Sequence, residues 1–231
     1  MDNLVVSAPP ALLTYYDDRT GEHVGLTAAE VGDWAAATAA LLVEGCALGP
    51  GDRAAALLQP HWQTAVALLG AWSAGLEVSY QIWATAGLQT QQETYDVTFV
   101  AGSRVRSWLE ELPKGRHQFV LGDAPDGYRS FPAAVRPYLG ARPPVHVVDD
   151  DDPAGPDGTT FRQWATIATG IAQTWGISRG DRVLIDASEH EQPVTWLLAP
   201  LSVGASVVLC ANLDRSALDA RMVEERVTKM I

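Results

Sequence analysis

The chain has 231 residues, of which 47% are hydrophobic and 19% charged, so it can bury a full core and is too apolar for intrinsic disorder. Its formal net charge is −12 and its basic residues do not cluster, which argues against a nucleic-acid-binding face. We find neither a signal peptide nor a membrane-spanning apolar run, and we expect a cytoplasmic protein without membrane insertion. Cys46 and Cys210 belong to no CxxC pair, so we interpret them as reduced core thiols rather than metal or redox ligands.

The first half is predicted to be an α/β unit. Extended segments at 13–16 and 23–26 flank a turn-rich stretch that suits a hairpin. Thr27 and Glu30 then form a capping box that starts a helix, which Gly45 can end. The elements expected next are a strand at 54–58, a helix at 62–74, a strand near Val78, a strand at 97–100, a helix at 103–112, a strand at 118–121 and a helix at 128–139.

An acidic stretch with Pro and Gly, residues 149–158, separates this half from the next. Its four adjacent aspartates at 149–152 are interpreted as a solvated loop, because carboxylates without a fixed scaffold make a poor metal cage. Beyond it we expect a helix at 161–175, a strand at 183–187, a helix at 194–203, a strand at 206–209, a helix from Asp214 to about 226 and a strand at 227–231. Strands joined through helices imply mainly parallel sheets. The predicted fold is therefore two α/β subdomains, 1–148 and 159–231, packed as one compact unit.

The second unit is predicted to repeat the first. Residues 48–80 align without a gap on 177–209, and ten of the 33 aligned pairs are identical, where average residue usage gives roughly two or three. Shared strand–helix–strand patterning accounts for matched leucines and for the closing glycine. It does not account for a Gly-Asp-Arg triplet found at both 51–53 and 180–182, so we infer a duplicated unit.

A His-x-Gln motif recurs at one register of this repeat, as His61 with Gln63 and as His190 with Gln192. Ligands of parallel sheets bind beyond the carboxyl ends of the strands, and both motifs fall between a strand end and a helix start. A helix N-terminus there favours a neutral histidine. We take His61, Gln63, Glu189, His190 and Gln192 as candidate ligand-binding residues. The alternative is that each histidine only starts its helix.

Three stretches resemble the N-terminal region of the AMP-binding acyl-CoA synthetases, which are adenylate-forming ligases. The first is LGPGDRAAALL from Leu48 with the HWQTAVALLGAWSAG that follows, the second is WGISRGDRVLI from Trp175, and the third is LLAPLSVGASVVL from Leu197. The EERVT stretch at 224–228 is similar to the one that enters the family's next strand. The resemblance covers nearly the whole chain, with a weaker patch from about 82 to 160. It implies the family's α/β fold and brings in ATP or AMP, Mg²⁺ and CoA as ligands to consider.

The chain departs from that family where ATP is handled. Family members carry a Ser/Thr/Gly-rich loop ending in Pro-Lys-Gly, whose backbone N–H groups would hold the phosphates. The equivalent place here offers only Gly158, Thr159 and Thr160 after an aspartate, and the Pro-Lys-Gly at 113–115 has no hydroxyl-rich loop before it. Glu189 and Glu191 also flank His190, where the family has an apolar acyl pocket. The chain stops before the family's adenine, ribose and hinge motifs.

These departures leave no residue to which a catalytic role can be assigned, and they leave the enzyme class open. We predict a non-catalytic descendant of the ligases that binds a small molecule or a protein partner. One alternative is a subunit of a split synthetase whose second polypeptide supplies the ATP-handling parts. The other is a stand-alone ligase with a rearranged site. The ligand, the partner and the oligomeric state, including a homo-oligomer, are not defined by the sequence.

Overall fold

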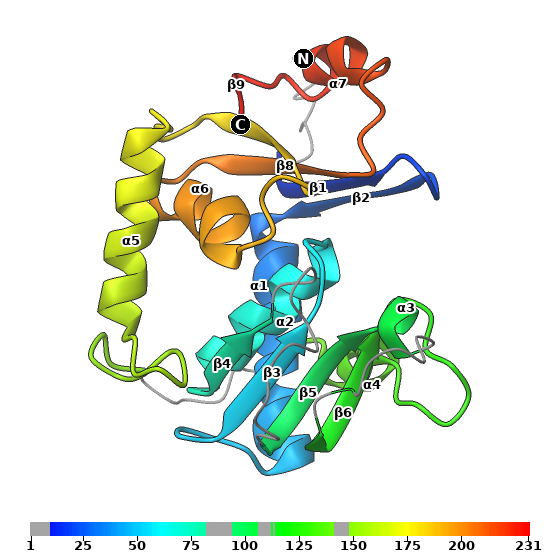
Figure 1. The fold of residues 1–231 in the computed structure, drawn as a ribbon, viewed down its shortest axis with the longest axis vertical. Coiled ribbons are helices and arrows are strands. Elements are labelled where there is room, and N and C mark those ends of the chain that lie inside the picture. Colours follow the sequence, from blue (N-terminus) through cyan, green and yellow to red (C-terminus); the bar gives the residue numbers. More distant parts are fainter. Residues whose placement is uncertain (1–9, 82–93, 106–111, 113, 141–147) are drawn as a thin grey trace, which may run out of the picture.

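The computed structural model describes residues 10–81, 94–105, 112, 114–140 and 148–231, which form two sheets with helices between and beside them (Figure 1). A five-stranded sheet has the order β2-β1-β8-β7-β9, and a four-stranded sheet has the order β4-β3-β5-β6. The strands are β1 (Ala11–Asp17), β2 (Glu22–Thr27), β3 (Arg53–Leu57), β4 (Glu77–Tyr80), β5 (Tyr95–Ala101), β6 (Gly115–Leu121), β7 (Arg182–Asp186), β8 (Ser206–Ala211) and β9 (Lys229–Met230). The β1–β2 hairpin is antiparallel and the other paired strands are parallel. The predicted α/β class with mainly parallel sheets is confirmed.

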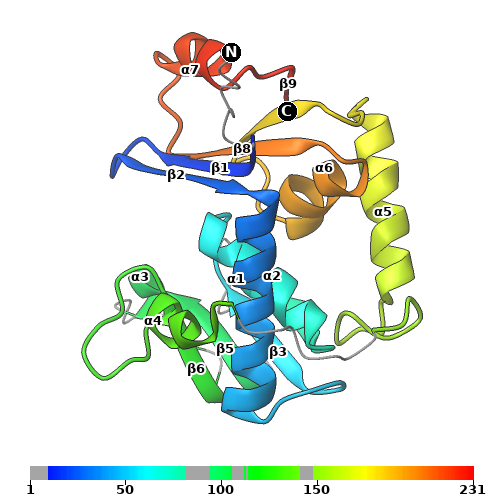
Figure 2. The same cartoon turned by 180° about the vertical axis from the view of Figure 1, so that it is seen from behind.

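The helices cover the sheets on their inner faces and at the sides. They are α1 (Ala28–Ala40) with the π-helical turn η1 (Leu41–Gly45), α2 (Trp62–Ser73), α3 (Gly102–Val105), α4 (Phe131–Val135) with the 3-10 turn η3 (Arg136–Tyr138), α5 (Phe161–Thr174), the π-helical turn η4 (Val194–Leu198) with α6 (Ala199–Ser202), and α7 (Leu218–Glu224). Seen from behind, α1 runs down from the five-stranded sheet and passes in front of the four-stranded sheet, with α2 next to it (Figure 2). Within the described ranges, no helix is long and apolar enough to cross a membrane.

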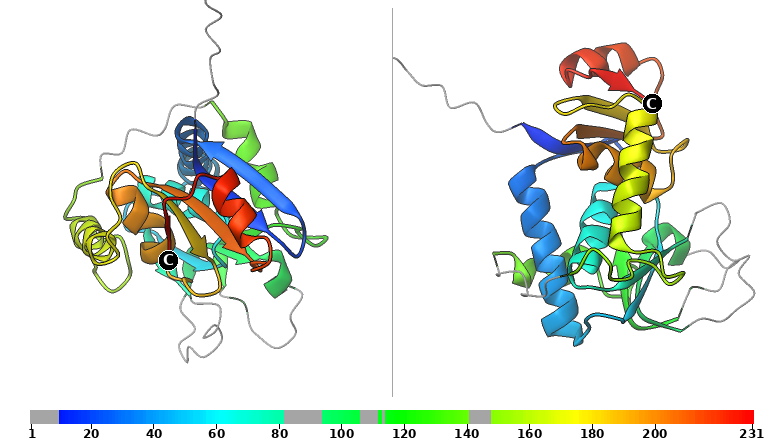
Figure 3. Two further views of the ribbon diagram at one scale, coloured as in Figure 1. Left: turned by 90° about the horizontal axis from the view of Figure 1, so that it is seen from above. Right: turned by 90° about the vertical axis from the view of Figure 1, so that its left-hand side faces the viewer.

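The N-terminal hairpin belongs to the sheet of the second half of the chain. β1 pairs in parallel with β8, from Leu13 opposite Val207 to Asp17 opposite Ala211, and the two strands lie side by side when the molecule is seen from above (Figure 3). The predicted boundary, with residues 1–148 in one subdomain, therefore needs correction for residues 11–27. The physical reason is that β7 covers only one edge of β8, and the hairpin closes the other.

Local signals explain how several elements begin and end. The predicted capping box is present, since the Glu30 N–H donates to Thr27 Oγ1 at 3.2 Å and the Thr27 N–H donates to Glu30 Oε2 at 2.8 Å. The helix expected at 128–139 is shorter and turns into a 3-10 helix at Arg136–Tyr138, because Pro137 lacks the N–H that an α-helix needs.

The helix expected from Asp214 begins only at Leu218. Asp214 Oδ1 instead accepts hydrogen bonds from the N–H and the hydroxyl of Ser216, which close a turn before the helix. Of the helix predicted at 103–112, the structure describes residues 103–105, which lie in α3, and residue 112.

The two Gly-Asp-Arg triplets form the same turn. Gly51 and Gly180 have φ values of 85° and 87°, a left-handed conformation that glycine adopts at no steric cost. Asp52 Oδ2 accepts the Gly49 N–H at 2.8 Å, and Asp181 Oδ2 accepts the Ser178 N–H at 2.7 Å. Each arginine then starts a strand, β3 or β7. The two turns therefore share their geometry, and the duplication itself stays a prediction.

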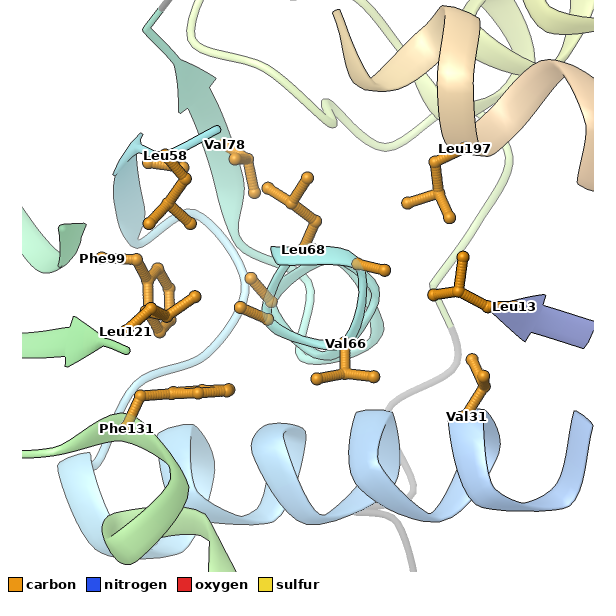
Figure 4. Packing of buried hydrophobic residues seen from close by; sticks show 14 of the residues in the cluster. Leu13, Val31, Leu58, Val66, Leu68, Val78, Phe99, Leu121, Phe131 and Leu197 are labelled. Atoms are coloured by element: carbon orange, nitrogen blue, oxygen red, sulfur yellow. The ribbon is translucent and has the colours of Figure 1, made fainter. Parts of the chain in front are cut away.

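The core is built around α2, which is buried on most of its surface between the two sheets. Figure 4 shows Val66 and Leu68 of this helix among side chains from the four-stranded sheet, such as Phe99, and from the other side, such as Leu13 and Leu197. Both cysteines are buried and free. This packing holds the carboxyl ends of the two sheets in fixed positions.

Candidate functional site

A cleft of about 270 Å³ lies at the carboxyl ends of strands from both sheets. Residues at the strand ends line it, namely Asp17 at the end of β1, Gln59 after β3, Ala101 of β5, Leu121 of β6, Ala187 after β7 and Ala211 of β8. This is the position at which parallel α/β sheets bind ligands. The prediction that a site would lie near Gln59 and Ala187 therefore corresponds to a real hollow in the structure.

His61 lines this cleft and also caps α2. Its Nδ1 accepts the Gln63 N–H at 3.0 Å, so the proton of the neutral ring belongs on Nε2, which lies 3.4 Å from Glu22 Oε2. The ring also packs edge-on against Tyr15, with the centroids 4.3 Å apart. The two interpretations offered for this histidine are thus not exclusive, because one residue starts the helix and forms part of the cleft wall.

Gln63 is buried next to the cleft and holds one of the residues that line it. Its Oε1 accepts the Gly122 N–H at 3.0 Å, which ties the start of α2 to the end of β6. Gly122 lines the cleft, whereas the Gln63 side chain does not. Gln63 is therefore placed to support the site rather than to contact a ligand directly.

The second His-x-Gln motif lies away from the first. The His190 ring packs edge-on against Trp175, with the centroids 5.2 Å apart. Gln192 lines a separate pocket of about 280 Å³, and Glu189 is exposed in the turn after β7. Glu191, which was not among the predicted site residues, lines the strand-end cleft. The structure therefore does not bring the two motifs together at one site.

Asp17 is the buried carboxylate of the cleft, and the sequence analysis missed it. Its side chain is only 8% exposed. Oδ1 accepts the Arg19 N–H at 2.9 Å, the Asn212 amide at 2.8 Å and the Thr20 N–H at 3.4 Å. Burial alone would raise the pKa of the Asp17 carboxyl, but these hydrogen bonds together hold it below its ordinary value. Asp17 therefore carries a negative charge at neutral pH.

Tyr15 contributes a second buried polar group to the same wall. The residue is 3% exposed, and burial, assisted by the carboxylates of Asp17 and Glu22, raises its pKa well above the ordinary range. The phenol therefore stays protonated. In the sequence, Tyr15 and Asp17 look like ordinary strand and turn residues, and no sequence signal marks either one as part of a cleft, although the structure buries both.

The degenerate phosphate loop uses its own polar groups internally. The Thr159 N–H donates to Asp157 Oδ1 at 3.0 Å, and Thr160 Oγ1 accepts the Gln163 N–H at 3.3 Å in the capping box that starts α5. Asp157 therefore binds the Thr159 N–H, a donor that a phosphate would need. The hydrogen bond from this N–H is the main cause of the lowered pKa of the Asp157 carboxyl. The basic residue beside the loop, Arg162, is paired with Asp150 and Asp151.

These residues do not fit a nucleoside triphosphate, whose phosphates need free N–H donors and cations. The Pro-Lys-Gly at 113–115 gives no substitute, because Gly115 begins β6 and so lies at the end of the strand opposite to the cleft. No group of three or more His, Cys, Asp or Glu side chains that could hold a metal ion was found in the part of the chain that the structure describes.

A larger, mainly apolar groove of about 760 Å³ runs beside this loop. It lies between α2, α5 and α6 and is lined by Leu69, Trp72, Trp164, Ala168, Leu198 and Leu201. Trp72, Trp164 and Leu198 also line the pocket that holds Gln192, so the two hollows adjoin. The groove is larger than the polar cleft at the strand ends and is distinct from it.

The fold is that of the N-terminal part of the acyl-CoA synthetases. The N-terminal domain of FACL13 from Mycobacterium tuberculosis matches with a TM-score of 0.68 and 15% identity, over 95% of this chain and 58% of that chain. Acetoacetyl-CoA synthetase from Streptomyces lividans matches with a TM-score of 0.71 and 20% identity, over 96% of this chain and 40% of that one. MbtA from Mycobacterium smegmatis matches with a TM-score of 0.68 and 25% identity, over 96% and 45%. The chain thus spans about half the length of these solved relatives, and the predicted family resemblance is confirmed for the fold.

The sequence places the chain more narrowly. A protein of Mycobacterium tuberculosis (strain ATCC 25618 / H37Rv), named TIGR03089 family protein, is 35% identical over 231 residues, which cover 95% of this chain and 90% of that protein. The chain belongs to the TIGR03089 family. A scan against protein-family models gives no match.

Proposed function

We propose that this chain is a ligand-binding module built on the ligase scaffold and that it does not form acyl-adenylates by itself. The observation that carries the proposal is the loop before α5, where Asp157 occupies the Thr159 N–H and the Thr160 hydroxyl is committed to the helix cap. Adenylation requires positive charge around a phosphate in its transition state. This loop presents negative charge instead, which supports binding without adenylation.

ATP–pyrophosphate exchange tests the proposal directly. The purified chain is assayed with Mg·ATP and a panel of short, long and aromatic acids, beside a thermal-shift series with Mg·ATP, AMP, CoA and acyl-CoAs. We expect no exchange above background and no shift with Mg·ATP, since a ligand at 100 times its Kd would add about 2.7 kcal/mol of stability. Acid-dependent exchange by the chain alone would instead support the stand-alone ligase.

A split synthetase is the second candidate, and the apolar groove between α2, α5 and α6 favours it. Apolar hollows of this size are typical of binding or docking sites. If a second polypeptide covers the groove, Trp164→Glu should abolish its co-purification with the chain and any exchange activity of the pair. If Trp164→Glu leaves the association with the second polypeptide intact, the groove no longer supports the split synthetase.

We also propose that the two units arose by duplication and that the protein is cytoplasmic. The matching turns at Gly51 and Gly180 support the first proposal. The buried free thiols of Cys46 and Cys210 support the second, since reduced cysteines are typical of reducing compartments. Cell fractionation tests the location, and recovery of the protein outside the cytosolic fraction would refute it.

A further inference from the structure

The groove between α2, α5 and α6 presents apolar surface, because polar side chains that line it are hydrogen-bonded within the chain. Trp72 Nε1 donates to the Ala154 carbonyl oxygen at 3.2 Å. The hydroxyls of Ser73 and Ser202 donate to carbonyl oxygens of their own helices at 2.7 and 2.8 Å. These donors are therefore already used, and the leucine and tryptophan side chains of the groove remain to be covered by the apolar surface of a partner.

The walls of the groove are helices, and a further helix fits between them. α1 covers one side of α2, where Gly70 approaches Thr38. Leu69 and Trp72, on another side of α2, face the groove, and α5 forms the opposite wall. Figure 1 shows α5 along one side of the molecule, next to α6, on which it packs. A helix laid in the groove at the usual axial spacing of about 8–10 Å would cover α2 here as α1 does elsewhere.

The charged residues that line this surface are all acidic. Asp149 and Asp150 line the groove, and Asp157 lines the pocket that adjoins it, whereas no Lys or Arg is found among the described residues that line either hollow. Arg162 stands beside the loop, but it pairs with both Asp150 and Asp151. A fatty acid or another carboxylate would therefore meet like charge at this end of the groove, and cations would be stabilised.

The number of carboxylates indicates what kind of cation fits. Residues 149–162 contain five aspartates and one arginine, so several cations on one partner would be needed to match them. A single amine would reach one carboxylate. A basic amphipathic helix instead carries Lys and Arg at many points beside an apolar face at i, i+3, i+4 and i+7. This combination is the one that helix-in-groove recognition uses.

We propose that the groove binds the apolar face of a basic amphipathic helix from a protein partner. The apolar side chains of that helix cover Trp72 and Trp164, and its Lys or Arg side chains pair with Asp149 and Asp150. The inference rests on the proposed binding function and names the class of partner. It does not depend on the cleft at the strand ends.

Three synthetic peptides of about 18 residues, or about five helical turns, serve as probes. The first consists of leucine and lysine, with leucine at the spacing of one helix face. The second has glutamate in place of every lysine, and the third has the composition of the first in an order that forms no apolar face. Calorimetry and the anisotropy of labelled peptides measure binding to the full chain. We expect the first peptide to bind and the other two to bind at least about tenfold more weakly.

Two variants on α5 connect binding to the groove. Ala165 is exposed and lines the groove, so Ala165→Trp places a large side chain in the space of the partner helix. Affinity for the leucine–lysine peptide should fall by at least about tenfold. Thr166→Trp is the matched control, because Thr166 is the next residue of the same helix and is exposed but does not line the groove. Its affinity should equal that of the native chain.

Two double variants separate local charge from the net charge of the protein. Asp149→Asn with Asp150→Asn should weaken binding of the leucine–lysine peptide by at least about threefold, the effect of losing two exposed ion pairs. Asp123→Asn with Asp126→Asn is the control, since it changes the net charge equally at exposed residues that do not line the groove. This pair also keeps the test valid if Ala165→Trp does not fold.

Binding of the leucine–lysine peptide that Ala165→Trp and the Asp149/Asp150 variant weaken, and that both controls leave unchanged, supports the inference. No binding of this peptide, equal binding of the glutamate peptide, or equal weakening by the two double variants would overturn it.

Other occupants of the groove are further outcomes that would overturn the inference. One is binding of dodecanol or dodecanoate, blocked by Ala165→Trp, without binding of any peptide. Another is a dimer in sedimentation velocity that Ala165→Trp converts to a monomer. Acid-dependent pyrophosphate exchange by the chain alone would overturn the proposed function instead, whatever the peptides show.

Discussion

Arg221 lies over the ring of Tyr16, with its guanidinium carbon 4.3 Å from the ring centroid, and donates to both carboxylate oxygens of Asp18. The contact fixes α7 to the end of β1, so it joins segments from the two ends of the described chain. The Arg221 and Asp18 side chains are 10% and 14% exposed. A bidentate pair with this little solvent is stronger than an ordinary surface ion pair.

Replacing Arg221 by alanine should therefore destabilise the protein. We expect a loss of about 2–4 kcal/mol, because Asp18 would be left largely buried without its cation and Tyr16 without its cation–π partner. Urea unfolding followed by tryptophan fluorescence measures the change. Arg162→Ala serves as the control, since Arg162 pairs with Asp151 on an exposed surface, and its unfolding midpoint should stay at that of the native protein. Equal midpoints for both variants would contradict the role of Arg221.

The protein should lose stability in acid, because the carboxylates near β1 become protonated. The pKa of Asp18 is lowered chiefly by the Arg221 hydrogen bonds, and that of Asp17 is lowered by its own hydrogen bonds against the effect of burial. A carboxyl whose folded pKa is lowered stabilises the protein fully above its unfolded value of about 4 and loses that contribution as the pH falls through the folded pKa. The midpoint should therefore drop steadily below about pH 5, with a shallower slope in Arg221→Ala. An unchanged slope in that variant would argue against the assignment to Asp18.

Gly70 marks the closest approach of α1 and α2. A Cβ at this position would lie 2.4 Å from the Thr38 Cβ and 2.8 Å from the Ala35 carbonyl oxygen. Gly70→Ala should therefore cost about 1–3 kcal/mol through overpacking. Gly32→Ala in α1 is the matched control, because nothing lies within 4 Å of its added methyl group and helix propensity predicts a gain of up to about 1 kcal/mol. Thermal unfolding should move in opposite directions for the two variants, and a common direction would refute the packing argument.

The two histidines of the His-x-Gln motifs should respond differently to truncation. His61→Ala removes the cap of α2 and should cost about 1 kcal/mol, whereas His61→Asn keeps a capping acceptor and should recover most of the loss. His190 has no such bond, and His190→Ala removes an edge-on contact with Trp175 that is worth about 0.5–1 kcal/mol. Urea unfolding of the three variants tests this order. If His61→Asn is as unstable as His61→Ala, capping is not the source of the effect.

Local features of this fold could be predicted from the sequence with good success. The Thr27–Glu30 capping box, the turns at Asp52 and Asp181, and the apolar run that follows Arg53 in β3 each depend on neighbours within a few residues. The position of the strand ends was also predictable, because it follows from the order of strands and helices, and a ligand site there stays a prediction.

Long-range relations were not predictable in the same way. Nothing within residues 11–17 specifies that β1 pairs with β8, a strand that begins at Ser206. The importance of Asp17 depends on Asn212, which is 195 positions away along the chain. The repeat suggested that His61 and His190 would share a role, but Trp175 packs against only the second. These properties arise from tertiary contacts that a single sequence does not reveal.

The pairing of β1 with β8 also limits how the chain can be divided. The five-stranded sheet takes β1 and β2 from before the acidic loop and β7, β8 and β9 from after it, so neither side of the loop contains this sheet complete. A fragment ending near residue 148 would expose the hairpin, and the complementary fragment would expose the edge of β8, which is a surface prone to self-association. During synthesis the hairpin must wait for β8 to be made before it can pair, so the molecule completes its fold late and as one cooperative body.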